Sequence, residues 1–443
     1  MIDMTEGKPS TLILKFAFPM IIGNIFQQLY NLVDTIVVGK FVGTNALAAV
    51  GSSFAIMVFV TSIIIGLCMG SGVILSQYYG SKEMEKFKKV TVNSFIFISA
   101  VTIILMVISL VFIDSILSIF NMPIELIPDA KTYLIIIIIG LVFTFLYNGT
   151  TSLLRAVGDS KRPLYFLIVA AIINVVLDLV FVLVFDLGVM GVALATIIAQ
   201  GVSALLGVFY TYKNLKLLNI ERKDIRIDRE VFKVTAKYSV LTAVQQSIMN
   251  LGILFVQGLV NTFGATVMAA FAAGVKIDSL AYMPVQDYGN AFSTYVAQNT
   301  GAKRFDRVRE GIKFSVKAII IFCGIISVSI IVFSKKLMLL FVDKNEVEVI
   351  KLGVEYISVV GVFYVLIGFL FMFYGIYRAI GYLNMSIGLT VISLGTRVIL
   401  AYMLASTSLG ASGIWWAIPI GWALADIVGY LVYKKKVSNG ITC

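Results

Sequence analysis

Long apolar stretches alternate with short polar segments along the whole chain. A helix needs about 20 mostly apolar residues to cross the hydrocarbon core of a bilayer, so each such stretch predicts a membrane-spanning helix. Several stretches exceed that length, which predicts tilted helices or helices that extend beyond the bilayer. Twelve stretches meet the criterion, approximately at 12–38, 46–79, 90–113, 128–153, 163–185, 189–212, 231–262, 265–298, 312–333, 348–376, 382–405 and 410–433.

The composition supports this interpretation. Apolar residues make up 59% of the 443 residues and charged residues only 13%, whereas soluble domains carry about 25% charged residues. A chain this apolar cannot cover its own surface in water. The composition therefore predicts an all-α integral membrane protein and excludes a soluble enzyme and a nucleic-acid-binding protein.

The positive charge is unevenly distributed. If both termini are cytoplasmic, most of the 35 lysine and arginine residues fall in cytoplasmic segments, in clusters such as 82–89, 213–237 and 303–317. Cytoplasmic loops of membrane proteins carry such an excess. The net charge of +11 is therefore assigned to loops, and the pattern predicts a multi-pass protein of the plasma (inner) membrane with both termini in the cytoplasm.

The sequence repeats itself once. Residues 43–94 align without a gap on residues 264–315. Two later landmarks recur in the same order, RAVG at 155–158 with RAIG at 378–381, and LGVMG at 187–191 with LGASG at 409–413.

The repeat predicts two homologous six-helix lobes, 1–213 and 231–443, joined by a cytoplasmic linker at 214–230. Because each lobe has an even number of spans, both enter the membrane from the same side. The expected pseudo-symmetry axis lies along the membrane normal, with the lobes around a central cavity. This is the architecture of a transporter; a duplicated membrane scaffold is the alternative.

One polar stripe interrupts the first apolar stretch. Asn24, Gln27, Asn31 and Asp34 follow one another at spacings of three and four, which places them on one helix face. Such a face cannot point into lipid, so it lines water or packs on another helix. An ionisable residue at membrane depth costs about 3 kcal/mol or more, which makes Asp34 a functional candidate.

A second polar pair lies in the fifth stretch. Asn174 and Asp178 are four residues apart in an otherwise apolar segment and share a helix face. One carboxylate with a neutral amide supplies the hard oxygens that a small cation such as Na⁺ binds. A proton site is equally compatible, since an apolar environment favours the neutral form of a carboxylic acid.

The acids of the first half have no counterparts in the second. At the offsets of the repeat, Asp34 aligns with Phe255, Asp178 with Ala401 and Asn174 with Arg397. We therefore expect cation coupling in the N-terminal half. Histidine is absent, which leaves carboxylates as the groups for proton or cation chemistry.

The second half carries other polar residues whose roles the sequence leaves open. Arg397 and Asp426 are candidate structural partners, and Lys276 with Asp278 is a candidate local pair. The acid Asp287 could attract a cationic substrate, and the seventh stretch has a neutral polar face. The expected substrate-binding residues are Gln27, Asn31, Gln246, Asn250, Tyr282 and Asp287.

An ordered set of segments resembles the multidrug and toxic compound extrusion (MATE) family over nearly the whole chain. The resemblance lies in PMIIGNIFQQLYNLVDTIVVGKFVG (19–43), LLRAVGDSKRP (153–163), NVVLDLVF (174–181), GVALATIIAQ (191–200) and MPVQDYGNAFSTYVAQNTGAKR (283–304).

The resemblance implies a secondary antiporter that expels cationic amphipathic compounds in exchange for H⁺ or Na⁺ by alternating access. It implies a cation-coupling site at Asp34, Asn174 and Asp178, which would be the site of any bound Na⁺. It adds Asn148 and Thr196 as polar neighbours of that site, and Pro19 as the point where the first helix bends. Family members with acids in the seventh and tenth helices differ from this chain, which has none there.

Two other functions stay open: a lipid-linked oligosaccharide flippase of the same broader superfamily, and a non-transporting membrane sensor or scaffold. A flippase would require several in-span cations for pyrophosphate, and this chain offers Arg397 and Lys276. The expected protein is not an enzyme and has no cofactor besides a coupling ion. Its expected partners are small molecules and membrane lipid, not nucleic acid, and it is expected to be a monomer.

Overall fold

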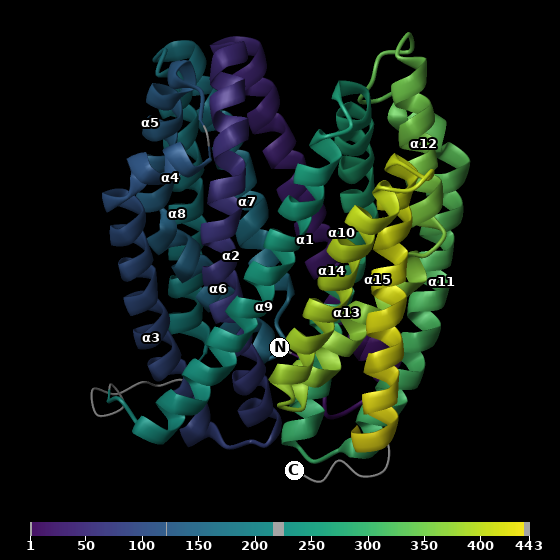
Figure 1. Cartoon of the computed structure of the whole chain (residues 1–443). Helices are drawn as coiled ribbons and strands as arrows, with labels where there is room; N and C mark the ends of the chain where they lie inside the picture. Colours follow the sequence, from purple (N-terminus) through teal and green to yellow (C-terminus); the bar gives the residue numbers. More distant parts are fainter. Residues whose placement is uncertain (1, 121, 216–225, 438–443) are drawn as a thin grey trace. The chain divides into compact units, whose positions relative to one another are not determined.

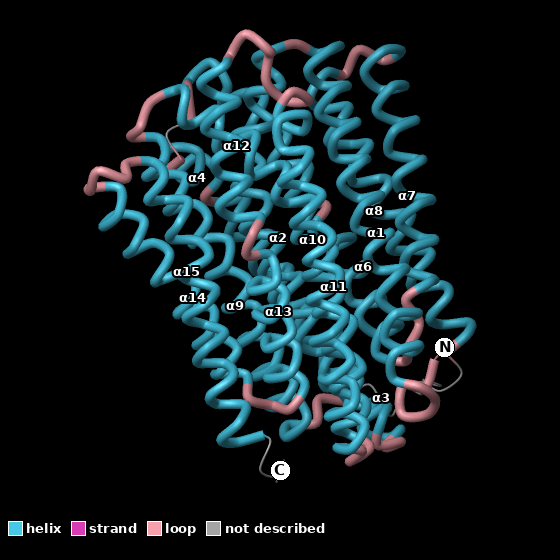
Figure 2. Tube along the Cα trace, turned by 90° about the vertical axis from the view of Figure 1, so that its right-hand side faces the viewer, coloured by secondary structure: helices cyan, strands magenta, loops and turns pink. Residues whose placement is uncertain are grey.

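The computed structural model describes residues 2–120, 122–215 and 226–437, and these residues form helices joined by loops and turns (Figure 2). Ten of the described helices are long and apolar enough to span a membrane, or up to twelve spans if each bent pair counts as one. The prediction of an all-α integral membrane protein is confirmed.

The helices follow the predicted apolar stretches (Figure 1). In chain order they are α1 (Pro9–Val37), η1 (Val38–Val42), α2 (Thr44–Gly80), α3 (Met84–Val111), α4 (Ile113–Ile119), η2 (Ile124–Leu126), α5 (Ile127–Ile139), α6 (Leu141–Ala156), α7 (Lys161–Leu179), η3 (Val180–Val184), α8 (Gly188–Asn214), α9 (Arg229–Asn261), α10 (Ala265–Gly301), α11 (Phe305–Met338), α12 (Val347–Gly361), α13 (Tyr364–Ala379), α14 (Leu383–Ala405), α15 (Ala411–Val432) and η5 (Tyr433–Val437).

Two predicted spans are bent rather than straight. The stretch 128–153 is divided into α5 and α6, which meet at 42°, and the stretch 348–376 into α12 and α13, which meet at 51°. At the first break, a side chain on Gly140 would collide with Ile197, because a Cβ there would lie 2.5 Å from the isoleucine Cγ2. A continuous run of apolar residues reports length but not curvature, so the bends were not predictable from hydropathy.

The backbone confirms the internal repeat. Residues with a positive φ angle, which L-amino acids other than glycine rarely adopt, recur at offsets of 221 to 223. The pairs are Gly43 and Gly264 (φ 121° and 90°), Lys82 and Lys303 (60° and 56°), Gly158 and Gly381 (79° and 85°), and Gly188 and Gly410 (54° and 53°). The bent pairs α5–α6 and α12–α13 correspond in the same way.

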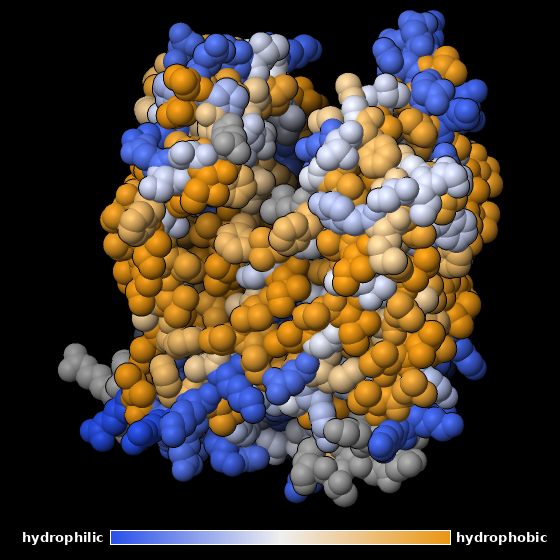
Figure 3. All heavy atoms as spheres, in the orientation of Figure 1, coloured by the Kyte–Doolittle hydropathy of each residue, from blue (hydrophilic) through white to orange (hydrophobic). Residues whose placement is uncertain are grey.

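Contacts divide the chain into two compact units. The N-unit comprises Met1–Asp3 and Phe18–Gln246, and the C-unit comprises Met4–Ala17 and Ser247–Cys443. On the face of each unit shown in Figure 3, hydrophobic side chains form a broad band between hydrophilic ends. Phe18, Ile172 and Ile321 are more than 60% exposed in this structure, as expected for side chains that contact lipid rather than water.

The division at α9 has a structural cause. The first half of this helix lies against α2 at two glycines, where a Cβ on Gly66 would lie 2.5 Å from Ala243 Cα and one on Gly70 would lie 2.3 Å from Tyr238 O. That close approach groups residues up to Gln246 with the N-unit. The lobe boundaries drawn from the sequence stay a prediction, and part of the predicted linker, 216–225, lies outside the described residues.

Asp228 caps the first turn of α9 and forms an ion pair with Lys89 of the basic cluster 82–89. One carboxylate oxygen accepts the backbone N–H groups of Glu230 and Val231 at 3.2 and 3.3 Å, and the other accepts the Lys89 ammonium at 2.9 Å. The Lys89 hydrogen bond, helped by these backbone donors, holds the pKa of Asp228 below its ordinary value. The cap and the ion pair together set where α9 begins.

We expect Gly70→Ala to destabilise the protein by about 1–3 kcal/mol, the usual cost of overpacking, because the added methyl group meets backbone atoms of α9. The measurement is the loss of monodisperse protein on heating in detergent. Gly51→Ala on the same helix is the matched control, since nothing lies within 4 Å of a Cβ there. Equal melting of the two variants would contradict the close crossing of α2 and α9.

Candidate functional site

Helices α1 and α7 bring two carboxyl groups together inside the N-unit. Asp34 on α1 and Asp178 on α7 lie within hydrogen-bonding reach of each other. Asp178 is fully buried and Asn174, one turn earlier on the same helix face, is 2% exposed. The structure therefore brings Asp34 close to Asp178, with Asn174 one turn away on the helix of Asp178; that the three residues form one cation site stays a prediction.

The pair lacks hydrogen-bond donors. Within the part of the chain that the structure describes, both carboxylate oxygens of Asp178, Oδ1 of Asp34 and both amide atoms of Asn174 have no hydrogen-bond partner. Ionised carboxylates only accept hydrogen bonds, and a buried ion without a partner costs several kcal/mol. Two facing carboxyl groups therefore require a shared proton or a cation between them.

The donor set fits a monovalent cation or a proton. Two carboxylates and an amide offer several hard oxygens with one or two negative charges, which suits Na⁺ as well as H⁺. Within residues 2–120, 122–215 and 226–437, no three or more His, Cys, Asp or Glu side chains form a group that could hold a metal ion. A site for a multivalent metal that depends on three acidic ligands is thus not formed by these residues.

Two tyrosines adjoin the carboxylates, and the sequence analysis did not assign them. Tyr133 on α5 is 7% exposed and lies within electrostatic range of both acids, and its hydroxyl lies 3.9 Å from the Met57 sulfur. Tyr30 on α1 lies within range of Asp34 and shares a hydrogen bond with Gln27. Tyr133 aligns with Tyr356 at offset 223 of the repeat. A tyrosine at the same position of both halves is a feature by which the sequence could have identified it.

Irregular helical turns follow both acids. α1 changes into the π-helical turn η1 (Val38–Val42) one turn after Asp34, and α7 changes into η3 (Val180–Val184) two residues after Asp178. π-Helical turns are rare and occur frequently at functional sites. They leave the helix ends beside the carboxylates less regular than the rest of α1 and α7.

Asn148 and Thr196, the polar neighbours that the resemblance adds to the cation site, form hydrogen bonds with the backbone of their own helices. The Asn148 amide donates to Thr144 O at 2.8 Å and the Thr196 hydroxyl to Val192 O at 3.0 Å, so these hydrogen bonds stay within their own helices. Neither bond reaches the carboxylate pair, and a role for both residues in the cation site stays a prediction.

Pro19 lies inside α1, which is one continuous helix in this structure. Proline removes a backbone hydrogen bond from a helix interior. Residues of α1 up to Ala17 belong to the C-unit and those from Phe18 onward to the N-unit. The change of unit therefore lies next to Pro19, where the helix lacks a backbone hydrogen bond. The bending role expected for Pro19 stays a prediction.

The expected substrate-binding residues divide between the two units. Gln27, Asn31 and Gln246 belong to the N-unit, and Asn250, Tyr282 and Asp287 belong to the C-unit. Asn31 donates to Gln28 Oε1 at 3.4 Å, and Asp287 is only 9% exposed on α10. Their assignment to a substrate cavity stays a prediction.

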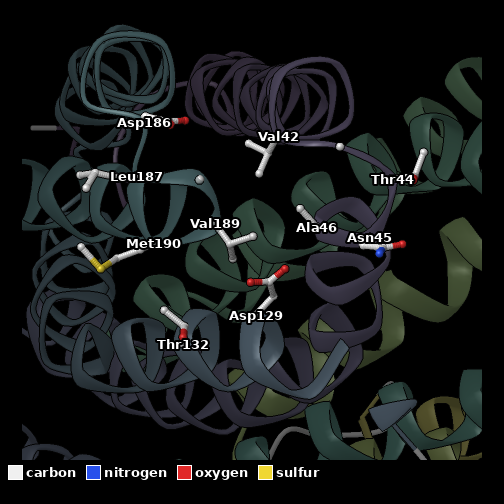
Figure 4. Close-up of a pocket in the computed structure, with 12 residues that line it drawn as sticks. Val42, Thr44, Asn45, Ala46, Asp129, Thr132, Asp186, Leu187, Val189 and Met190 are labelled. Atoms are coloured by element: carbon white, nitrogen blue, oxygen red, sulfur yellow. The ribbon is translucent and has the colours of Figure 1, made fainter. Parts of the chain in front are cut away.

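A pocket of about 490 Å³ opens in the N-unit where η1, α2, α5 and α8 end or begin (Figure 4). Two of its lining residues are acids, and Figure 4 shows the Asp129 carboxylate directed into it. The lining consists of Val42, Gly43, Thr44, Asn45, Ala46, Asp129, Thr132, Asp186, Leu187, Gly188, Val189 and Met190.

Two residues of the pocket lining belong to an apolar cluster that also contains Tyr133, a neighbour of the carboxylate pair. Ala46 and Val189 of the pocket pack in one cluster with Tyr133 and Val182, and Asp186 follows Asp178 by eight residues. Acidic groups at the mouth of a cavity raise the local concentration of cations. The pocket and the carboxylate pair therefore both attract positively charged ions.

In the C-unit, the structure corrects the expected partner of Arg397. Its guanidinium lies in electrostatic range of Asp278, Tyr356 and Tyr282, rather than pairing with Asp426. Neither carboxylate oxygen of Asp426 has a hydrogen-bond partner within the described ranges. Tyrosines and Arg397, not Lys276, are the neighbours of Asp278 that the structure records.

A twice-repeated helical membrane unit, with a buried carboxylate pair in one copy, defines a protein of the membrane transporter class. The family is shown directly by comparison: the MatE family model matches residues 19–180 and again 242–403, and the chain belongs to this family. The two matches lie at the offset of the internal repeat. MatE proteins are transporters and not enzymes, as the sequence predicted.

Relatives match over almost the full length of the chain. The Bacillus subtilis "Probable multidrug resistance protein YpnP" is 31% identical over 98% of this chain and 96% of its own. The Shewanella oneidensis "FAD transporter" is 25% identical over 96% and 94%. A solved outward-facing multidrug resistance MATE family transporter superposes with a TM-score of 0.92 at 25% identity, over 98% and 97% of the two chains.

Cross-linking can test the carboxylate pair without reference to transport. We expect Asp34→Cys combined with Asp178→Cys to form a disulfide under mild oxidation, because disulfides need Cβ atoms about 4 Å apart. The matched control is Gln27→Cys with Asp178→Cys, since residue 27 lies about 10 Å further along α1 at 1.5 Å per residue. Mass spectrometry of the proteolysed protein detects the linked peptides, and equal linkage in both variants would contradict the assigned geometry.

Proposed function

We propose that this protein is a multidrug efflux antiporter of the plasma membrane, which exports cationic amphipathic compounds by alternating access in exchange for inward H⁺ or Na⁺. The observation that carries the proposal is the close pair Asp34 and Asp178, in which Oδ1 of Asp34 and both carboxylate oxygens of Asp178 are buried without a hydrogen-bond partner among the described residues. A bound coupling ion would supply the positive charge that neutralises these carboxylates. Export of drugs is supported by relatives whose names describe multidrug resistance.

The coupling follows from the chemistry of the pair. With a proton or Na⁺ bound, the two carboxyl groups can stay together in the apolar unit; without it, like charges repel and draw water. A ligand shifts a conformational equilibrium only by its different affinities for the two states. Ion binding would therefore favour the state with α1 and α7 close, and drug binding would favour the other.

Helix α1 is suited to relay that change. Its first part, up to Ala17, is grouped with the C-unit, and the part from Phe18 onward with the N-unit, which holds Asp34. A displacement of Asp34 is thus transmitted along one helix that belongs to both units. Pro19 lies at the point where the helix is weakest.

The flippase alternative is less well supported. Recognition of a pyrophosphate favours several unengaged arginines. Arg378 is 5% exposed and donates to Asn290 Oδ1 at 3.1 Å and Tyr374 O at 3.2 Å, and Arg397 lies beside Asp278. Arg378 is therefore engaged by hydrogen bonds inside the protein, and Arg397 has an acidic neighbour already.

We expect Asp34→Asn and Asp178→Asn each to reduce ion-driven efflux of ethidium from proteoliposomes to the level of empty liposomes. The amide keeps the size of the side chain but loses the negative charge that holds the ion. Asp114→Asn is the matched control, because it makes the same substitution at an exposed acid that pairs with Lys131 on the protein surface, and it should retain most of the activity. Export against a gradient by a folded Asp34→Asn variant would sink the proposal.

The same proteoliposomes distinguish the coupling ion when Na⁺ and pH gradients are imposed separately. If the pair binds Na⁺, an inward Na⁺ gradient alone should drive ethidium export; if it binds H⁺, only the pH gradient should. The Shewanella oneidensis relative carries the name of a FAD transporter, so FAD belongs among the competing substrates. Inhibition of ethidium export by FAD, which is an anion, but not by amphipathic cations would contradict the proposed substrate class.

A further inference from the structure

The C-unit contains a polar cluster built around Asp278 on α10. The Tyr356 hydroxyl on α12 donates to its Oδ2 at 3.3 Å, and the Tyr364 hydroxyl on α13 lies near the same carboxylate. Arg397 on α14 lies in electrostatic range of the same carboxylate. The two tyrosines are 1% and 2% exposed, whereas Asp278 and Arg397 are partly buried.

This cluster occupies the position that corresponds to the ion site of the N-unit. Tyr356 aligns with Tyr133 at offset 223, Asp278 with Met57 at offset 221 and Arg397 with Asn174 at offset 223. The correspondence extends to a contact: Tyr133 Oη lies 3.9 Å from the sulfur of Met57, and Tyr356 Oη lies 3.3 Å from the carboxylate of Asp278. The two clusters thus occupy equivalent positions in the two copies of the repeated fold.

The two copies differ in their charge. In the N-unit two carboxylates face each other beside a neutral amide, and no fixed cation is among their recorded neighbours. In the C-unit a single carboxylate faces a guanidinium at the position of that amide. Arginine stays protonated in proteins, so the cation of the C-unit is permanently part of the chain.

We propose that Arg397 is a tethered counter-cation that closes the C-unit copy of the ion site to mobile cations and so confines ion coupling to the N-unit. This inference rests on the proposed function of Asp34 and Asp178 as the coupling site. It makes Arg397 a specificity-determining residue, because its charge decides how many ions the duplicated fold can bind.

Among the described residues, the guanidinium of Arg397 is the one positively charged group that acts on the Asp278 carboxylate. The other groups that act on it are hydroxyls, from Tyr282 on α10, Tyr356 on α12 and Tyr364 on α13. From α15, the neutral ring of Trp415 packs on Tyr356 at 5.1 Å between centroids. Nε of Arg397 has no hydrogen-bond partner within the described residues, so the guanidinium is not fully used in structural hydrogen bonds.

Replacing Arg397 by the residue of the N-unit copy should therefore open the site. In Arg397→Asn, Asp278 keeps its tyrosine donors but loses its counter-charge, and the smaller side chain leaves room for an ion. Carboxylate, amide and hydroxyl oxygens are ligands that Na⁺ accepts, and a buried carboxylate without a cation also takes up a proton.

The test measures ion binding to the purified full-length protein in detergent, by calorimetric titration with NaCl and by proton uptake in weakly buffered solution. Asp34→Asn with Asp178→Asn removes the N-unit site, and this double variant should lose specific ion binding. Adding Arg397→Asn should strengthen binding of Na⁺ or H⁺ by at least about tenfold, which is a free-energy gain of about 1.4 kcal/mol. Adding Asp278→Asn as well should abolish it.

Two matched variants separate charge from structure. Arg397→Lys keeps the positive charge and should leave the site closed, whereas Arg397→Gln removes the charge and keeps most of the stem, and should open it. The melting temperature in detergent establishes that each variant is folded, and Arg397→Gln replaces Arg397→Asn if the latter does not fold.

The outcomes distinguish the two proposals. If the double variant of Asp34 and Asp178 still binds ions like the wild type, and Asp278→Asn removes that binding, the C-unit site is open with Arg397 present and the inference fails together with the proposed coupling site. If the double variant loses binding and neither Arg397→Asn nor Arg397→Gln restores it in folded protein, only the inference about Arg397 fails. Restoration that persists without Asp278 also overturns it.

Discussion

The cost of a carboxylate inside an apolar helical unit governs the organisation of this protein. A charge at membrane depth must be neutralised by a proton, a cation or a fixed partner. In the N-unit, three of the four carboxylate oxygens of Asp34 and Asp178 are buried without a hydrogen-bond partner among the described residues, which is the basis for proposing that a bound ion neutralises the pair. An ion that enters and leaves this site changes whether α1 and α7 can stay close, which converts ion binding into a conformational preference.

Duplication explains how such a site could be specialised in one copy. The backbone repeats down to single positive φ angles, as at Gly43 and Gly264, and the bent spans α5–α6 and α12–α13 correspond. The side chains at corresponding positions nevertheless differ, with Asn174 in one unit and Arg397 in the other. Helix packing is maintained by small and apolar residues, so the polar groups at one buried position could change without altering the fold.

Much of the fold could be predicted from apolar runs, since a span is a matter of length and hydropathy. The repeat offsets and the two polar faces, that of Asp34 and that of Asn174 and Asp178, were also accessible, because helical spacing places residues on faces; their grouping into one site was implied only by the family resemblance. The bends at Gly140 and Phe363, the π-helical turns after the acids and the neighbours Tyr30 and Tyr133 were not. They depend on how helices contact one another, which periodicity along a single chain does not report.

By itself, the sequence determined that the chain resides in lipid, that it is built twice, and that its few buried acids lie unequally in the two halves. These properties follow from composition and spacing, which are local. Only the tertiary structure decided which charges meet: Asp34 with Asp178, and Asp278 with Arg397 rather than Asp426 with Arg397. The physical reason is that charges on different helices interact over distances that depend on packing, and packing is a property of the folded chain.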